Sequence, residues 1–471
     1  MGHHLGMQTP TPVRSSPVPS SGTAMADWPQ REHLDLHDEL HARPATAVRS
    51  PGVVSYWIQH QMDAEQALQA LGLLCEHLGL PAPAAQARHH VLCCPEFDLK
   101  FERHGEFISW QLGAALPAPP GLRDDAGLAQ ILSTAAALHH LPAAFVQAIS
   151  ATPMLAGAHV LLLKAPDSQW RQRCCDLMAQ DLAATGTQGD AAAVLASRIS
   201  DDLATVLTSL RLGHDGFVRF VLLDHGLPPD RAARNVQRLC EIEAYRMLAM
   251  LGFPVARTEG SALNQIEASL QHIVDDMANE RTLDDATAFD TLLRLSAEIE
   301  HSAARTRYRL SATRAYQSIV QARLAGLREE RVEGLQKLSD FFSRRFAPAM
   351  ALCESTDARI TDIAERINRA VDLARVRVEA RREANNQELL RSLAHRQKLQ
   401  LRLQQTVEGL SVVAISYYAL SIVAYATKAV DGMKLPGGIE LQYEVITALA
   451  VVPVVALVYR MVSRVRRRLE P

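Results

Sequence analysis

The sequence predicts an α+β protein that is predominantly helical, with a cytosolic α/β domain, a long helical stalk and a C-terminal hairpin of two transmembrane helices. Three observations lead to this fold class. Strand-like and helix-like apolar segments alternate in residues 29–255. Residues 349–408 contain neither Gly nor Pro, and two uncharged apolar stretches follow them. Of the 471 residues 48% are hydrophobic, which excludes wholesale disorder.

The sequence divides into five segments. Their predicted ranges are a disordered leader at 1–28, the α/β domain at 29–255, the stalk at 256–408, the transmembrane hairpin at 409–462 and a basic cytosolic tail at 463–471. The leader is rich in Pro, Ser and Thr and has no apolar core, so it does not read as a secretory signal, and Met25 is a candidate start.

Charge and cysteine content point to a cytosolic front domain. Residues 1–300 hold 21 Lys and Arg against 35 Asp and Glu, a net charge of −14, whereas residues 301–407 carry +9. The seven cysteines form no C-x-x-C pair, and an odd count with two adjacent pairs is not a disulfide framework. We therefore expect reduced thiols.

The front domain contains several recognisable elements. Strands are predicted at 53–59, 91–92, 158–164 and 216–223, a hairpin over 97–112 that turns at Arg103–Glu106, and helices at 64–77 and 231–251. Only helices are expected beyond residue 255.

The stalk is predicted as two long antiparallel helices. The first covers roughly residues 286–346, and Pro348 separates it from the second, which has sixty residues without a helix breaker. The second helix begins with apolar residues at heptad spacing, and this partial coiled-coil pattern fades at Arg377 and Arg381. The apolar positions are Ile360, Ile363, Ile367, Ala370 and Ala374.

Two segments are predicted to span a membrane. Residues 409–427 are uncharged and would measure about 28 Å as a helix, close to the hydrocarbon thickness. The second span, 443–460, has a shorter uncharged core around Pro453. It can cross the bilayer only if the polar residues at its ends lie at the membrane–water interfaces. Nine Lys and Arg flank the outer ends of the hairpin against two in its linker, which predicts that both termini lie in the cytoplasm.

Small and hydroxylated residues share one face of the first span. Ser411, Ala414, Tyr418, Ser421 and Tyr425 recur at spacings of three and four. Two interpretations are open: a helix-packing face, which small residues favour, or the lining of a pore. The span contains no ionisable group that would mark an ion path, which favours packing.

Two groups in the front domain carry potential chemistry. His37, Glu39 and His41 form a candidate metal set, because the two imidazoles would share a face if the segment were helical. The order is not H-E-x-x-H and Pro44 follows, so a structural or capping role is the alternative. The segment KFERHGEF at 100–107 groups charges near a turn, where surface ion pairs are more common than catalytic sets.

Other function classes lack their motifs. The sequence has no glycine-rich phosphate loop and no G-x-S-x-G, so we expect no enzyme and no cofactor. The basic stalk intersperses its cations with acids and offers no aromatic stacking platform, so nucleic acid is not an expected partner. The expected partners are the lipid bilayer, further copies of the chain and an unidentified protein.

Several segments together resemble one known family. They are HDELHARP at 37–44, KFERHGEF at 100–107, HDGF at 214–217, QRLCEIEAYRMLAM at 237–250 and LQLRLQQTVEGLSVVAISYY at 399–418. The chain resembles, over roughly residues 31–465, a bacterial family of membrane-anchored proteins that carries a domain-of-unknown-function label. The resemblance implies anchoring in a bacterial inner membrane and assigns no activity.

The layout is also similar to that of CorA-type magnesium transporters. These have a cytosolic α/β domain, a very long helix that enters the first span, a second span and a basic cytosolic end. Their Gly-Met-Asn motif follows the first span, where this chain has Gly432-Met433-Lys434. A lysine there disfavours cation binding.

Three functions are weighed. The leading hypothesis is a membrane-anchored scaffold or sensor whose front domain binds a partner. The alternative is a CorA-like divalent-cation channel or transporter with Ser411, Tyr418, Ser421 and Tyr425 around its axis. A metal-dependent enzyme that uses His37, Glu39 and His41 is the third.

Overall fold

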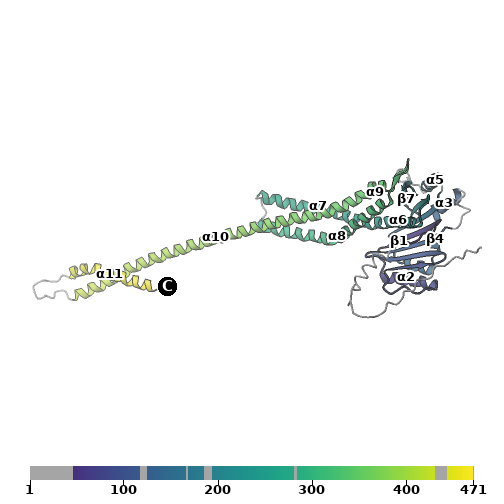
Figure 1. Cartoon of the computed structure of the whole chain (residues 1–471). Coiled ribbons are helices and arrows are strands. Elements are labelled where there is room, and N and C mark those ends of the chain that lie inside the picture. Colours follow the sequence, from purple (N-terminus) through teal and green to yellow (C-terminus); the bar gives the residue numbers. More distant parts are fainter. Residues whose placement is uncertain are drawn as a thin grey trace, which may run out of the picture. The chain divides into compact units, whose positions relative to one another are not determined.

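The computed structural model describes residues 46–116, 125–165, 168–184, 194–279, 284–429 and 443–469. Within them the chain forms two compact units. The first comprises residues up to Ala268 together with Ala297–Ala364, and the second comprises Ser269–Ser296 and the residues from Glu365 onward. The division cuts through three helices, so each unit contains only part of each (Figure 1).

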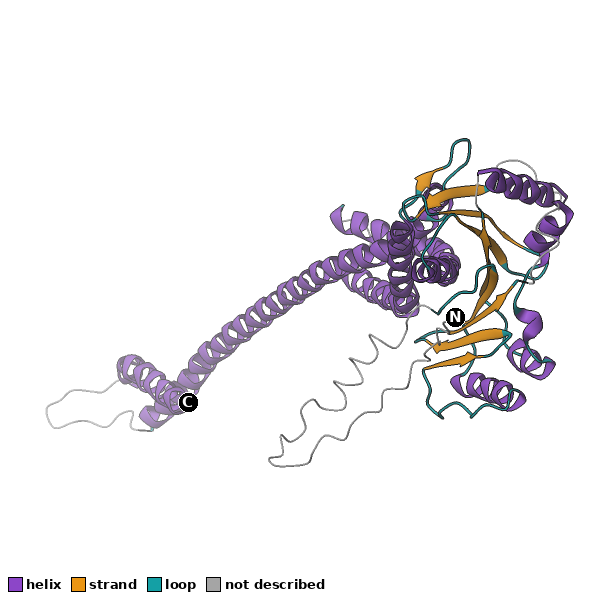
Figure 2. Cartoon of the chain, turned by 45° about the vertical axis from the view of Figure 1, so that its right-hand side comes forward, coloured by secondary structure: helices purple, strands orange, loops and turns teal. Residues whose placement is uncertain are grey.

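The described part of the first unit contains one mixed sheet of nine strands (Figure 2). The strand order is β2-β3-β4-β1-β5-β8-β7-β6-β9, and only β5 and β8 pair in parallel. The strands are β1 (Gly52–Gln59), β2 (His89–Cys93), β3 (Phe97–Arg103), β4 (Ile108–Ala115), β5 (Ala156–Lys164), β6 (Leu195–Ile199), β7 (Ala204–Leu212), β8 (Val218–Asp224) and β9 (Glu330–Arg331).

Helices lie on both faces of this sheet (Figure 2). One face packs with helices α2 to α5 into a single apolar core that includes Trp110 and Phe145, whose rings meet edge to face at 5.3 Å. The other face is crossed by α6, which lies against β1, β5 and β8. The helices are α2 (Ala64–His77), α3 (Asp125–Thr134), the 3₁₀ turn η1 (Leu138–His140), α4 (Ala143–Ser150), α5 (Ser168–Ala184) and α6 (Pro229–Met250).

Local sequence signals account for several element ends. The Asp63 side chain accepts a hydrogen bond from the backbone N–H of Glu65 and caps α2. Pro229 occupies the first turn of α6, where no backbone donor is needed. All of β1 is buried, as expected for a strand covered on both faces.

The remaining helices are α7 (Gly252–Ala278), α8 (Asp285–Leu327), α9 (Leu338–Arg345), α10 (Ala347–Lys428) and α11 (Tyr443–Leu469). The helix without breakers is confirmed as α10, which is continuous for 82 residues. Its five heptad positions from Ile360 to Ala374 are all buried. Arg377 then donates to the carbonyl of Met277, and Arg381 pairs with Asp285.

Two expectations for the region after residue 255 are wrong. The helix predicted over 286–346 ends at Leu327, because Arg328 takes a left-handed φ of 52° and Gly334 one of 76°. The region is also not helical throughout, since β9 pairs antiparallel with β6 and forms one edge of the sheet. Sequence periodicity did not reveal a strand of two residues.

Candidate functional site

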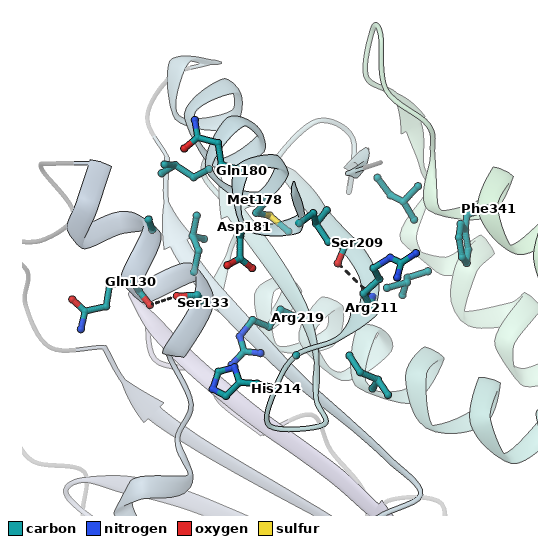
Figure 3. A pocket seen from close by; sticks show the side chains of 18 of the residues that line it. Gln130, Ser133, Met178, Gln180, Asp181, Ser209, Arg211, His214, Arg219 and Phe341 are labelled. Carbon is teal, nitrogen blue, oxygen red and sulfur yellow. Dashed lines mark hydrogen bonds between the residues drawn. The ribbon is translucent and has the colours of Figure 1, made fainter. Parts of the chain in front are cut away.

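A cavity of about 1030 Å³ opens in the first unit beside the ends of β7 and β8 (Figure 3). Helices α3, α5 and α9 complete its walls. Apolar side chains such as Leu132, Met178 and Phe341 line it together with polar and charged groups. A mostly apolar cavity with a few convergent polar groups is the usual form of a small-molecule site.

An irregularity in β7 shapes the cavity wall. Thr208 pairs with Phe220 and Leu212 pairs with Val218, so three residues of β7 lie opposite Arg219 alone. A bulge of this kind bends a strand and redirects its side chains. The bulged residues Ser209, Leu210 and Arg211 all line the cavity.

Leu210 lies at the centre of this bulge in a strained conformation. Its φ is 51°, in the left-handed region that a bulky side chain rarely adopts. The Thr208 hydroxyl holds the bulge, because it accepts from the N–H of Leu210 at 3.0 Å and donates to the carbonyl of Arg219 at 2.8 Å. Backbone strain of this type concentrates at functional sites.

The cavity lining is cationic. Arg211, Arg219 and Arg345 line it together with one carboxylate, that of Asp181. His214 lies beside Arg219 (Figure 3). The Arg219 side chain is only 12% exposed, and its Nε is buried without a hydrogen-bond partner. Asp215 balances the charge of Arg219, so Arg211 and Arg345 against Asp181 give the lining its net positive charge, which favours an anionic ligand.

Behind the cavity wall, a line of polar contacts crosses the sheet. Asp215 holds the Arg219 guanidinium through both carboxylate oxygens, at 2.6 and 3.2 Å. Its Oδ2 lies 3.3 Å from His159 Nε2, and His159 Nδ1 lies 2.8 Å from the Ser55 hydroxyl. Phe217 stacks on the imidazole with ring centroids 4.2 Å apart.

Burial and neighbouring charges determine the protonation states of His159 and Asp215. Burial lowers the pKa of the fully buried His159, which is therefore neutral at pH 7. Burial would raise the pKa of Asp215, but the adjacent His159 Nε2 together with hydrogen bonds from Arg219 and the Phe217 N–H outweighs it and holds that pKa well below its ordinary value. Asp215 is therefore a carboxylate that orients both neighbours.

Ser55, His159 and Asp215 have the residue types and order of a hydrolytic triad, but their setting is structural. Ser55 and His159 are both 0% exposed. The backbone N–H of Ala137 donates to the Ser55 oxygen at 2.8 Å and occupies one of its two lone pairs. In this structure the three residues therefore form a buried polar network that links β1, β5 and the loop before β8.

The KFERHGEF segment forms the turn of the β3–β4 hairpin, and its carboxylates are largely buried. Glu102 pairs with Lys100 at 3.1 Å, and Glu106 accepts from Arg309 at 2.6 Å and from the Tyr316 hydroxyl at 2.9 Å. The expectation of surface pairs is wrong here, because the Glu106 and Arg309 side chains are 11% and 14% exposed. These contacts fasten the hairpin to α8.

The predicted metal set His37, Glu39 and His41 lies outside the described residues. Among the residues that the structure does describe, no group of three or more His, Cys, Asp or Glu side chains is placed to hold a metal ion. All seven cysteines are free thiols, and burial raises the pKa of Cys174 to about 12 and that of Cys175 to about 11.

Two helices of the second unit are long and apolar enough to cross a membrane. They are the end of α10 and α11, and only 6% of the apolar window in each is buried. The two helices contact one another through Thr427 and Thr447, whose hydroxyl oxygens lie 3.3 Å apart. Ser416 and Val458 are the buried residues of this pair of segments.

The face proposed for packing or a pore points away from this contact. Tyr418 and Tyr425 are 68% and 78% exposed. The Ser411 and Ser421 hydroxyls donate back to the carbonyls of Val407 and Tyr417 in their own helix. The cavity and the bulge were not predicted, although the HDGF motif at 214–217 lies between the two strands that form them.

Comparison with curated proteins finds no match to this chain. The likeness in layout to CorA-type transporters gains no support from the comparisons. The expected membership in a domain-of-unknown-function family is confirmed. The model of the family described as "Protein of unknown function (DUF3422)" matches residues 26–469, so the chain belongs to that family.

Proposed function

We propose that this protein is a scaffold or sensor anchored in the bacterial inner membrane, which presents its sheet domain in the cytoplasm. The observation that carries the proposal is the continuity of α10. One helix begins among buried residues of the first unit and ends in an exposed apolar stretch. Apolar surface of that extent is unfavourable in water and favourable in lipid.

The orientation follows from the basic residues at the ends of the hairpin. Arg391, Arg396, Lys398 and Arg402 precede the first span, and five arginines from Arg460 onward follow the second. The linker carries Lys428 and Lys434. Basic residues stay on the cytoplasmic side, so both termini are cytoplasmic and the chain is multi-pass.

Labelling of intact cells with a membrane-impermeant maleimide tests this orientation. In a Cys93→Ser background, which removes the exposed native thiol, Lys434→Cys is expected to react in intact cells and Arg464→Cys only after permeabilisation. Extraction at alkaline pH should leave the chain in the membrane pellet. Release into the soluble fraction, or labelling of Arg464→Cys in intact cells, would contradict the proposal.

The sensing element is the cationic cavity beside the β7 bulge, and its ligand is a small anion with an apolar body. The arginine excess supplies the charge that such a ligand needs, and Phe341, Met178 and Leu132 supply apolar contact. The proposed role is binding without catalysis, which the inaccessible Ser55 hydroxyl supports.

Calorimetric titration of the full-length chain with 4-phenylbutyrate tests the cavity. The carboxylate should bind and 4-phenylbutan-1-ol should not, because only the acid pairs with the arginines. Arg345→Ala should weaken binding about tenfold, corresponding to about 1.4 kcal/mol. Arg344→Ala is the matched control, since Arg344 precedes Arg345 in α9 but does not line the cavity. Equal binding of acid and alcohol, or equal loss in both variants, would refute the site.

A further inference from the structure

Beyond Arg381, which pairs with Asp285, the middle of α10 has no partner among the described residues. Every residue from Arg382 to Val407 is exposed, a length of about 39 Å. Large apolar side chains are exposed along it, including Leu390 at 64% and Leu403 at 70%. Most helical stability in proteins comes from a packed apolar face, and this stretch lacks one within the chain.

From Asn386 to Val407 most of its charged side chains lie on one face, with Arg396 as the exception. An uncharged seam recurs at alternating spacings of four and three residues, and it comprises Asn386, Leu390, Leu393, Gln397, Gln400, Gln404 and Val407. A charged stripe has the same alternation on the opposite face, and it comprises Glu388, Arg391, His395, Lys398 and Arg402. Positions with this 3.5-residue period stay on one face of a supercoiled helix.

The seam continues without a change of phase into the first span. The next positions at the same alternation are Ser411, Ala414, Tyr418, Ser421 and Tyr425. This is the face that α11 leaves uncovered, since Tyr418 and Tyr425 are mostly exposed. A tyrosine hydroxyl in the hydrocarbon layer needs a protein partner, because lipid chains offer no hydrogen bond.

We propose that a second copy of this chain covers the seam, parallel and in register, from Asn386 in water to Tyr425 in the membrane. The proposal rests on the membrane anchoring proposed above, because copies inserted in one orientation present the same seam at the same depth. Uncharged seams then meet, and the charged stripes remain in solvent. The hydroxyl face of the span is thus a helix-packing face and lines no pore.

The seam composition fits a partner with the same sequence. Gln397, Gln400 and Gln404 can each hydrogen-bond the same residue of the other copy, because an amide group is both donor and acceptor. Polar seam residues of this type fix register at some cost in stability. Leu401 and Leu403 flank the seam and gain burial in the pair.

Disulfide trapping in membranes tests the pairing with matched positions. In the Cys93→Ser full-length chain, Gln400→Cys and Ala414→Cys are expected to form crosslinked dimers rapidly on mild oxidation. Lys398→Cys and His395→Cys on the charged stripe are the controls and should crosslink little. Crosslinking at Gln400→Cys should be lost when Gln397→Lys places a charge in the seam, and retained with Lys398→Gln.

The outcomes separate this inference from the anchoring. Equal crosslinking at seam and stripe positions, or a monomeric mass by light scattering in detergent, would refute the proposed pairing of two copies. If the chain fractionates as soluble but still crosslinks only at seam positions, the membrane anchoring is refuted and the pairing of two α10 helices stands. Reaction at Gln400→Cys but not at Ala414→Cys would overturn continuity into the span.

Discussion

Gly157 is the residue at which β5 leaves no space for a side chain. A Cβ atom there would lie 2.7 Å from Phe217 Cδ1 and 2.7 Å from Met154 Sδ. The Gly157→Ala variant is therefore expected to lose about 2 kcal/mol of unfolding free energy. Gly105→Ala is the control, since nothing lies within 4 Å of its Cβ position, and should change stability by less than about 0.5 kcal/mol in denaturant titrations.

Because His159 is buried, the stability of the fold is expected to decrease as the pH falls. Burial lowers its pKa in the folded state below the ordinary value of about 6.5, so the unfolded chain binds a proton more readily. The histidine contribution to stability is complete above that value and decreases as the pH falls below it. The thermal midpoint should fall from pH 7.5 to pH 5.5, and less steeply in His159→Gln. Parallel pH profiles for the two proteins would show that His159 does not carry the effect.

At the residue scale, the sequence identified charged and polar groups more readily than the residues that they contact. The charged turn at 100–107 was recognised, but Glu106 binds Arg309 and Tyr316, which lie more than 200 positions later. The contact between Ser55 and His159 could not be predicted, because each is an isolated polar residue in an apolar strand. Only the antiparallel pairing of β1 with β5 brings them together.

At the element scale, the β3–β4 hairpin and α8 are joined by one largely buried carboxylate. The Glu106→Ala variant leaves Arg309 without its charge partner, and Nη1 of that arginine is already buried and unpaired. We expect the variant to lose about 3 kcal/mol of unfolding free energy.

The matched control for the Glu106 prediction is Glu330→Ala on β9. Glu330 pairs with Arg198 at 3.0 Å, but its side chain is 54% exposed, so removal should cost less than about 1 kcal/mol. Comparable losses of unfolding free energy in urea titrations of the two variants would contradict the role of Glu106 in joining the hairpin to α8.

Elements with one strong periodic signal were predictable, and those defined by tertiary pairing were not. The helix at 64–77 and the hairpin at 97–112 were predicted because their polarity alternates with the correct period. β6 and β7 were missed, since Ser200, Asp201 and Asp202 join them through three successive left-handed residues that do not resemble a hairpin turn. The bulge at Leu210 interrupts the alternation of β7 further.

At the scale of the whole molecule, the last residues of α10 that belong to a packed core are Ile367, Ala370 and Ala374. A chain that ends after Gln400 keeps all three, so it should remain in solution without detergent and unfold cooperatively. A chain that ends after Arg366 loses them and should be less stable by several kcal/mol, on the order of 3. Equal urea midpoints for the two truncations would contradict this assignment of the core.

The large-scale architecture was the most predictable level. The absence of Gly and Pro over 349–408 and the uncharged residues after it identified α10 and the two apolar helices directly. The cavity was not predictable, because it depends on how α3, α5 and α9 meet one irregular strand end. Those helices have ordinary sequences, and only their packing creates the space.

The return of the chain at β9 has a consequence for biosynthesis. β6 finds its outer partner in residues 330–331, after the chain has built α6, α7 and α8. During translation the edge of β6 therefore stays open for more than a hundred residues, a state that invites pairing with other nascent chains. The apolar helices emerge later still, from residue 409 onward. The sheet can thus close before the ribosome delivers the two apolar helices.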